Sequence, residues 1–280
     1  MNKDLAGKEY WDESWLVGEI PLPVDPQDLG VNNYTNFTNR RFHEYFHKIF
    51  SGLDNRGLRL LEIGCARSVW LPYFAKEFGF KVYGIDYSEV GCQQARQILS
   101  KAAVEGEVVC ADFFSPPTTM LETFDVVVSF GVAEHFEDTK NCIIQFSKFI
   151  KPDGMMITII PNLTGWFGSL QKTFNIEVYK VHVIRSVQEF RLAHIQANMK
   201  VLECNYFISQ SLALVSLKGL NPNQVGTRLK ILAQLFLILL AQLIWLFEDY
   251  VKPLPVTAML SPYIVCVAQK DVLNSDNNNE

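Results

Sequence analysis

Leu60-Leu61-Glu62-Ile63-Gly64-Cys65-Ala66-Arg67-Ser68 is the stretch that decides the fold of this chain. A short apolar run that ends in glycine and small residues is typical of a buried parallel strand followed by a tight turn. Gly64 permits a positive φ and a close approach of a ligand to the backbone. We therefore predict a strand over residues 58–63, a turn through Gly64, and a helix over residues 69–78.

The same strand-to-helix pattern recurs further along the chain. Ser88 is well placed to cap a helix, because its hydroxyl can accept a hydrogen bond from the first helical turn. Alternating strands and helices imply a parallel sheet with helices on both faces. The predicted fold is α/β, a doubly wound, mostly parallel seven-stranded sheet. Its other predicted elements are strands at 80–85, 107–111, 124–130, 155–160, 201–208 and 263–268, helices at 88–103, 137–150 and 186–198, and a turn at 151–154.

Chemistry-bearing residues follow the predicted strands. In parallel sheets of this kind, ligands bind beyond the carboxyl ends of the strands. That rule gathers Gly64, Asp86, Asp112, Phe130 and Asn162 around one crevice.

The two aspartates favour a nucleoside ligand. Asp86 lies 22 residues after Gly64, at the end of the next strand, where a carboxylate can accept both ribose hydroxyls. Asp112 ends the third strand and could accept a hydrogen bond from an exocyclic adenine amine. Acidic residues at both positions predict a nucleoside site without a diphosphate.

These motifs resemble those of class I, Rossmann-like, S-adenosylmethionine-dependent methyltransferases. Residues 61–66 resemble the motif that holds the methionine part of the cofactor, 84–88 the ribose motif and 111–113 the adenine motif. Residues 124–129 with Glu134-His135, and 151–154 through Pro161-Asn162, resemble the motifs of strands four and five. The resemblance implies S-adenosylmethionine as the cofactor. The implied cofactor-binding residues are Glu62, Gly64, Cys65, Ala66, Asp86, Tyr87, Asp112, Phe113 and Phe130.

Ala66 departs from the family pattern, which has a second glycine there. We expect its extra methyl group to face the cofactor. A nicotinamide-dependent oxidoreductase is disfavoured, because the pyrophosphate would need G-x-G-x-x-G and only Gly64 fits. A non-catalytic nucleoside-binding module on the same fold stays open.

Two histidines are candidates for catalysis. His135 follows the fourth strand at the mouth of the crevice, and an imidazole with its ordinary pKa near 6.5 can take a proton at neutral pH. His182 lies after strand five, where this fold commonly builds its acceptor site. A structural role is equally open for both. No ligand set for a catalytic metal stands out. The resemblance implies methyl transfer to an O or N atom of a small metabolite or natural-product intermediate.

The segments outside the motif region predict how the chain is divided. Residues 1–57 are expected to form an irregular arm and a helix covering the cofactor site, with Trp11, Trp15 and Tyr34 either capping the cofactor or fastening the arm. Residues 58–270 would form the methyltransferase domain. Residues 209–258 would be an apolar helical cap inserted before the last strand, and 271–280 a disordered tail.

The run 231–247 is apolar except for Gln234 and Gln242. A spanning helix needs about twenty residues, and two amides in hydrocarbon would be costly. We expect a cap helix or a homodimer contact. Peripheral contact with a membrane, or with a lipidic substrate at its surface, is the second alternative, and a transmembrane span the third.

The composition indicates which kinds of partner the protein binds and in which cellular compartment it lies. The formal net charge of −5 and the lack of a Lys/Arg run argue against a nucleic-acid substrate, because phosphate neutralisation carries most of that affinity. The six cysteines form no C-x-x-C pair, so they predict scattered core thiols in a reducing compartment. The first residues contain no apolar signal region, and we expect a cytoplasmic location.

Overall fold

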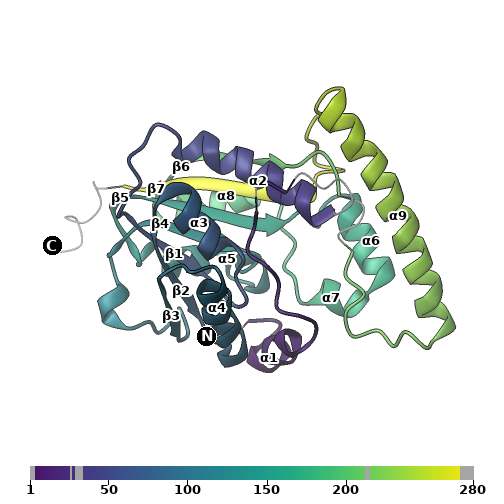
Figure 1. The fold of residues 1–280 in the computed structure, drawn as a ribbon, viewed down its shortest axis with the longest axis horizontal. Coiled ribbons are helices and arrows are strands. Elements are labelled where there is room, and N and C mark those ends of the chain that lie inside the picture. The colour runs from purple at the N-terminus through teal and green to yellow at the C-terminus, as the bar shows by residue number, and fades with distance from the viewer. Residues whose placement is uncertain (1–3, 26, 29–33, 212–214, 272–280) are drawn as a thin grey trace.

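A seven-stranded sheet with the order β3-β2-β1-β4-β5-β7-β6 organises the computed structural model (Figure 1). The structure describes residues 4–25, 27–28, 34–211 and 215–271. β7 is antiparallel to β5 and β6, and the other neighbours are parallel. The predicted fold class is therefore confirmed. The strands are β1 (Arg59–Ile63), β2 (Lys81–Asp86), β3 (Gly106–Cys110), β4 (Phe124–Phe130), β5 (Ile150–Pro161), β6 (Met199–Phe207) and β7 (Tyr263–Lys270).

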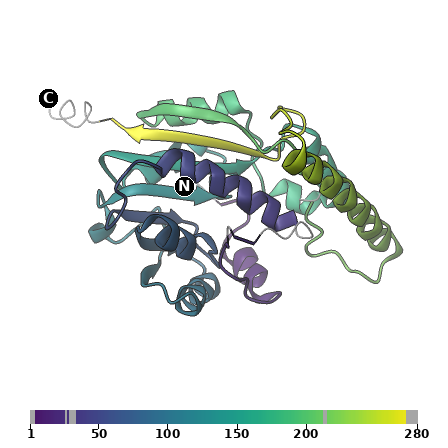
Figure 2. The ribbon, with the colours of Figure 1, turned by 45° about the horizontal axis from the view of Figure 1, so that its top comes forward.

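Helices cover both faces of this sheet (Figure 2). The side chains of one core join α2, α3, α4 and α9 to one face, and those of a second core join α5 and α8 to the other. The α-helices are α1 (Lys8–Leu16), α2 (Tyr34–Phe50), α3 (Trp70–Phe78), α4 (Glu89–Lys101), α5 (Thr139–Ser147), α6 (Trp166–Phe174), α7 (Ile176–Lys180), α8 (Val187–Gln196) and α9 (Val225–Tyr250).

The central strands supply both cores because successive side chains point to opposite faces. In β1, Leu60 packs into the first core and Leu61 into the second, and both are fully buried. This explains why the strand reads as a continuous apolar run rather than an alternating one.

The sequence prediction misplaced several elements. The N-terminal arm is not wholly irregular, because α1 forms within it. The predicted turn at 151–154 is instead part of β5, whose register against β4 shifts between Phe124 and Val126. Asp153 there has a φ of 63°, so the turn-forming residues make an irregularity inside the strand. α6 and α7 were not predicted at all.

The arm helix α2 packs on the sheet itself. Phe42, Phe46 and Phe50, spaced four residues apart, are buried in the first core with β-strand and α3 side chains. Among the described side chains of α2, from residue 36 onward, none lines the cavity described below. The division at residues 57 and 58 stays a prediction, and the tail from residue 272 lies outside the described residues.

Candidate active site

A cavity of about 230 Å³ lies where the first four strands end. Its lining comes from the strand ends, from the loops that follow them and from the N-terminal arm. The lining residues are Asp4, Trp11, Trp15, Glu62, Gly64, Ala66, Arg67, Ser68, Val69, Trp70, Asp86, Tyr87, Phe113, Phe130, Gly131, Val132, His135 and Phe136.

The turn after β1 requires glycine at its first position. Gly64 has a φ of 77°, and its N–H donates to the carbonyl of Ile85. A Cβ atom at Gly64 would lie 2.3 Å from Cγ2 of Val132. Any side chain here would therefore collide with Val132 in the loop after β4, at a φ that glycine adopts without strain.

The methyl group of Ala66 is accommodated by α4. A Cβ atom added to Gly91 of α4 would lie 2.4 Å from the Cβ of Ala66. Ala66 lines the cavity, and its methyl group also lies against a glycine of the neighbouring helix. The expected placement of that methyl group toward the cofactor stays a prediction. The missing glycine of the motif is thus compensated at position 91.

Asp86 is held rigidly at the end of β2. Its Oδ2 accepts a hydrogen bond from the backbone N–H of Ala66 at 3.0 Å, and its Oδ1 accepts one from the N–H of Ser88 at 2.8 Å. Burial raises the pKa of this carboxyl to about 6, although both hydrogen bonds favour the ionised form. A carboxylate oxygen has further lone pairs, so Asp86 can still accept two hydroxyl groups of a ligand.

Glu62 is a second buried carboxyl on the cavity wall. Its Oε2 accepts from the hydroxyl of Ser68 at 2.6 Å, and only 3% of the residue is exposed. Burial raises its pKa to about 8. A cationic ligand would compensate this desolvation, so Glu62 favours a positively charged group at this end of the cavity.

The third strand contributes an aromatic ring rather than a carboxylate. Phe113 is buried and lines the cavity. Asp112 is exposed, is not part of the lining, and accepts from the backbone N–H of Phe114 at 2.9 Å. The short side chain turns back onto its own loop, a common local interaction of aspartate at strand ends.

The N-terminal arm closes one side of the cavity. Asp4 accepts hydrogen bonds from Nε1 of Trp11 and from the hydroxyl of Tyr87, and the N–H of Leu5 donates to the carbonyl of His135. The rings of Trp11 and Trp15 stack at 5.7 Å. The sequence prediction missed Asp4, although the four-residue spacing of the two tryptophans signals the helix that places both rings on one side.

His135, His182 and Glu134 form one buried group beside the cavity. Nδ1 of His135 donates to the carbonyl of Val181, and Nδ1 of His182 donates to that of Val178, each at 2.7 Å. Each Nε2 atom therefore carries a free lone pair that can accept a hydrogen bond or bind a metal ion. Burial, and then the charge of His182, lower the pKa of His135 to about 4, which corrects the expectation of an ordinary imidazole.

Glu134 adds an unsatisfied carboxyl oxygen to this group. Its Oε2 is buried without a hydrogen-bond partner, its Oε1 lies 3.9 Å from Nε2 of His135, and burial raises its pKa to about 8. Candidate ligand atoms of the three residues lie within 4.8 Å of one another. The group could hold a divalent cation, a possibility that the sequence prediction did not include.

The structure brings most of the predicted site residues together. His182 lies behind His135, with ring centroids 4.7 Å apart, but does not line the cavity. Cys65 is fully buried outside the lining. Tyr34 begins α2, and its side chain is outside the described part of the chain. The predicted residues that do line the cavity are Trp11, Trp15, Glu62, Gly64, Ala66, Asp86, Tyr87, Phe113, Phe130 and His135.

A family model described as a methyltransferase domain matches residues 34–215. The chain belongs to this family. The resemblance to class I methyltransferases is thereby confirmed, and the match begins at α2 rather than at β1. The family assignment agrees with the strand order and with the turn at Gly64.

Relatives of this methyltransferase domain differ in their acceptors. Ubiquinone biosynthesis O-methyltransferase of Rhizobium rhizogenes is 32% identical over 110 residues, which is 39% of this chain and 43% of the relative. EEF1A lysine methyltransferase 2 of Danio rerio is 23% identical over 172 residues, covering 57% of this chain and 70% of the relative. The chain thus spans less than half the length of the first of these relatives.

Solved structures share the fold across the whole chain. The [4+2]-cyclase SpnF superimposes with a TM-score of 0.62 and 15% identity, over 97% of both chains. At this identity the likeness concerns the fold alone. A cyclase on a methyltransferase fold also illustrates that function must be argued from the site.

Proposed function

We propose that this protein is an S-adenosylmethionine-dependent methyltransferase that acts on an O or N atom of a small metabolite. The observation that carries the proposal is Asp86, a partly buried carboxylate fixed by two backbone N–H groups beside the Gly64 turn. A ribose diol is a ligand that matches a preorganised, doubly accepting carboxylate. The family match supports the same cofactor.

The cavity residues fit the three parts of the cofactor. Glu62 and the Gly64 turn would hold the positively charged methionine part, Asp86 the ribose, and Phe113 the face of the adenine. Gly64 lines the cavity with its backbone, and the buried Glu62 carboxyl would gain a counter-charge. When bound, S-adenosylmethionine supplies an electrophilic methyl group on its sulfonium.

His135 would serve the acceptor. Its Nδ1–H is fixed on the carbonyl of Val181, so its Nε2 lone pair is available to take a proton from a hydroxyl or an ammonium. The lowered pKa keeps the ring neutral at physiological pH. Placement of the two reactants would supply much of the remaining acceleration.

Calorimetry with S-adenosylhomocysteine tests the cofactor site. Asp86→Ala should weaken binding by about 1.5–3 kcal/mol, the range for hydrogen bonds to a charged group. Asp112→Ala is the matched control, because that carboxylate is exposed and outside the cavity lining. Equal affinities of the wild type and Asp86→Ala would remove the ribose assignment.

Turnover tests His135 and separates an enzyme from a binding module. Release of S-adenosylhomocysteine would be followed with a panel of small phenols, alcohols and amines. His135→Ala should slow it by about 10²–10⁴-fold while leaving affinity for S-adenosylhomocysteine nearly intact. Tight cofactor binding without methyl transfer to any acceptor would favour the non-catalytic alternative.

A second role for the buried group is metal binding. Glu134, His135 and His182 could hold one divalent cation that orients an acceptor oxygen, and the unpartnered Oε2 of Glu134 supports this alternative. Incubation with EDTA followed by Mg²⁺ or Zn²⁺ distinguishes the roles. Activity lost with EDTA and restored by metal supports the cation, whereas unchanged activity supports His135 acting as a base.

A lipidic acceptor at a membrane surface is the second candidate substrate class. It is supported by the exposed apolar side chains of α9. The name of the Rhizobium rhizogenes relative places that protein in ubiquinone biosynthesis. Higher turnover with long-chain phenols than with their short-chain analogues would favour this class. The cytoplasmic location, a homodimer and the lack of nucleic-acid binding stay predictions.

A further inference from the structure

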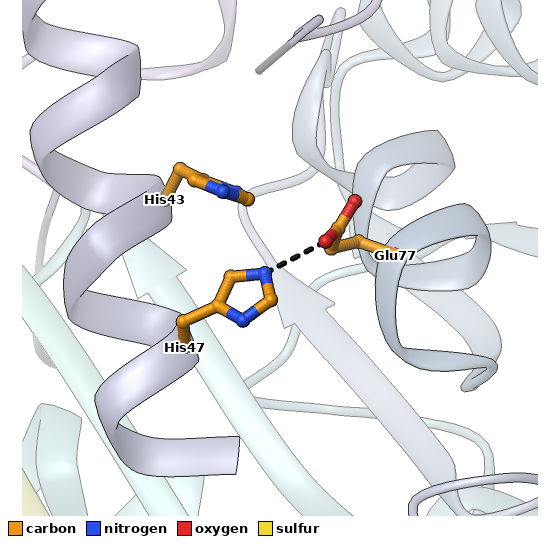
Figure 3. Close-up of side chains that lie close together, drawn as sticks. All are labelled: His43, His47 and Glu77. Atoms are coloured by element: carbon orange, nitrogen blue, oxygen red, sulfur yellow. Dashed lines mark hydrogen bonds and ion pairs between the residues drawn. The ribbon is translucent and has the colours of Figure 1, made fainter. Parts of the chain in front are cut away.

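Two histidines and a glutamate meet on the surface between α2 and α3, away from the cavity (Figure 3). His43 and His47 are four residues apart on α2, so both rings leave the same face of the helix. Glu77 reaches them from α3, with its Oε1 2.7 Å from Nε2 of His47. Candidate ligand atoms of the three residues lie within 4.8 Å of one another.

The arrangement is already close to that of a ligand set. Nδ1 of His43 lies 2.9 Å from the hydroxyl of Tyr73, which fixes the ring and leaves its other nitrogen available. The side chains of His47 and Glu77 are 42% and 29% exposed, so an ion can enter directly from solvent.

We propose that His43, His47 and Glu77 bind one divalent transition-metal ion, with water completing the coordination. Two imidazole nitrogens and one carboxylate oxygen suit Zn²⁺ or Ni²⁺, whereas Mg²⁺ and Ca²⁺ prefer oxygen ligands alone. The ion would join α2 to α3 and thereby stabilise the first core. The proposal does not depend on the methyltransferase function.

Zinc titration of protein without a polyhistidine tag tests this site. Saturating Zn²⁺ should raise the Tm of the wild type by about 5 °C. The double variant His43→Gln, His47→Gln should lose one bound zinc per chain and most of that rise. Lys48→Gln on the same helix is the matched control, and His182→Gln removes the buried group beside the cavity. Equal zinc stoichiometry in the double variant and the wild type would overturn the proposal.

A different observation concerns the outward face of α9. We define this face by its exposed large apolar residues, which recur at helical spacing along the whole helix. Their exposures range from 40% to 79%. They are Val225, Leu229, Leu232, Leu235, Phe236, Leu239, Leu243, Phe247 and Tyr250. A surface helix normally turns such a stripe toward the core.

The opposite side of α9 carries the polar contacts. Nζ of Lys230 donates to the carbonyl of Phe174, the hydroxyl of Ser209 donates to Glu248, and Arg40 and Arg41 pair with Asp249. The helix therefore faces the protein with many of its ionic groups and faces outward with its leucines. Its inward side also buries Ala241 and Trp245 in the first core, so α9 carries apolar side chains on both sides.

These contacts argue against a spanning role for α9. The helix has 26 residues and is apolar enough to cross a bilayer. However, it is attached to the domain from Lys230 in its second turn to Asp249 in its last. Insertion across a bilayer would break these bonds and bury the ion pairs in hydrocarbon, at a cost of several kcal/mol.

The charges at the ends of α9 indicate what covers the outward face. Arg228 and Lys252 are exposed near the two ends, whereas the acidic residues of the helix, Glu248 and Asp249, are turned toward the domain. Basic residues beside an apolar stripe are complementary to an anionic lipid surface. A second copy of the chain would bring the same positive ends together if it docked in parallel.

We propose that the outward face of α9 lies in the interface of an anionic lipid bilayer, parallel to the membrane plane. The apolar side chains would enter the acyl boundary, and Arg228 and Lys252 would contact lipid phosphates. Figures 1 and 2 place α9 at the outer end of the molecule, beyond α6 and α7, where a flat surface can approach it. This proposal holds whether or not the acceptor is lipidic.

Co-sedimentation with phosphatidylglycerol–phosphatidylcholine vesicles tests the membrane proposal. The triple variant Leu232→Glu, Leu239→Glu, Leu243→Glu should lose at least about tenfold in vesicle affinity, because each glutamate removes apolar contact and repels the lipid. Leu192→Glu with Leu202→Glu is the control, since both leucines are 50% exposed elsewhere on the molecule. Circular dichroism checks that all variants fold.

The charged ends give a second, independent readout. Arg228→Glu and Lys252→Glu should each weaken binding to anionic vesicles more than about fivefold, and the effect should fade at high salt. Two results would overturn the proposal. One is a wild-type protein that does not co-sediment with the vesicles. The other is a dimer, seen by sedimentation, that the triple leucine variant abolishes while vesicle binding is unchanged.

Discussion

The cavity and the outward face of α9 reverse the usual distribution of side chains in opposite ways. The cavity wall buries the carboxyl group of Glu62 and the group beside the cavity buries that of Glu134, each only 3% exposed. The face of α9 exposes leucines, with Leu239 and Leu243 at least 60% exposed. Buried unpaired acids and exposed apolar stripes are the informative exceptions to normal burial. A bound cation would compensate the buried carboxyl groups, and a bound apolar surface would remove the exposed leucines from water.

The helix α2 shows the usual distribution of side chains, with apolar residues buried and charged residues exposed or paired. Its phenylalanines point inward and its charged residues face solvent or pair with neighbours, as Arg41 does with Asp249. The comparison teaches that an apolar stripe in a sequence does not reveal whether protein, ligand or lipid covers it. The following predictions measure that difference.

The largest effect is expected in the ordinary core. Phe46 of α2 is fully buried among aromatic rings of α3 and β4. Phe46→Ala should lower the free energy of unfolding by about 3–5 kcal/mol, through lost burial and the cavity that remains. Urea denaturation measures this. A loss below about 1 kcal/mol would mean that α2 is not part of the cooperative core.

The ion pairs that attach α9 to α2 should contribute less to the free energy of unfolding than Phe46 does, but still a measurable amount. Asp249 accepts from Arg40 at 2.7 Å and from Arg41 at 2.6 Å, and its side chain is 12% exposed. Asp249→Ala should cost about 1–3 kcal/mol, the range for hydrogen bonds between charged groups. Asp54→Ala, which removes an exposed ion pair with Arg56, is the control and should cost almost nothing. Equal stabilities of both variants would show that α9 is not clamped here.

The buried acids should make stability fall as the pH rises from about 6.5 to 8. In that window the unfolded chain has ionised carboxyls, whereas Glu62 and Glu134, with pKa values of about 8, still hold protons in the folded state. The folded state binds more protons, so deprotonation removes stability, by on the order of 1 kcal/mol for each carboxyl.

Glu62→Gln should flatten about half of that decline in thermal melts. Below pH 6.5 the sign is mixed. Burial lowers the pKa values of His135 and His194 to about 4, so these two residues make the folded protein less stable as the pH falls. The pKa of Asp86 is raised to about 6, so Asp86 makes the folded protein more stable over part of the same range. Melting temperatures that rise between pH 6.5 and 8 in the wild type would contradict the assignment.

The smallest effect on stability is expected on the outward face of α9. Leu239 is 60% exposed, so Leu239→Ala should change the free energy of unfolding by less than about 0.5 kcal/mol. The contrast with Phe46→Ala sharpens the comparison between the two helices. A loss above about 1.5 kcal/mol in dilute, monomeric protein would mean that protein already covers this face.

The predictable part of the fold was the part governed by strand-end rules. Gly64, Asp86 and Phe130 could be placed around one crevice because parallel strands end at one edge. Ser88 was identified as a helix cap, and its hydroxyl does accept from the N–H of Gly91. Local chemistry and sheet topology agree in this region, so the sequence was sufficient.

The rest depends on long-range contacts that no local pattern encodes. Asp4 lines the cavity only because Trp11 and Tyr87 hold it there. His182 meets His135 because two carbonyls of one segment, Val178 in α7 and Val181 just after it, fix both rings. Asp4 lies before the first residue of α1, so no helical or strand periodicity relates it to Trp11, and the arm could not be folded onto the cavity from sequence alone.

The contact between Ala66 and Gly91 couples two positions that are distant in sequence. Alanine at both positions would force the two methyl groups to overlap, since the Cβ atoms would be 2.4 Å apart. Glycine at position 66 would remove that overlap, but a Cβ at position 91 would still lie 3.0 Å from the Cα atom of residue 66 and 3.1 Å from Cδ1 of Trp15. In relatives that carry alanine at the position of Ala66, the position of Gly91 should therefore stay glycine.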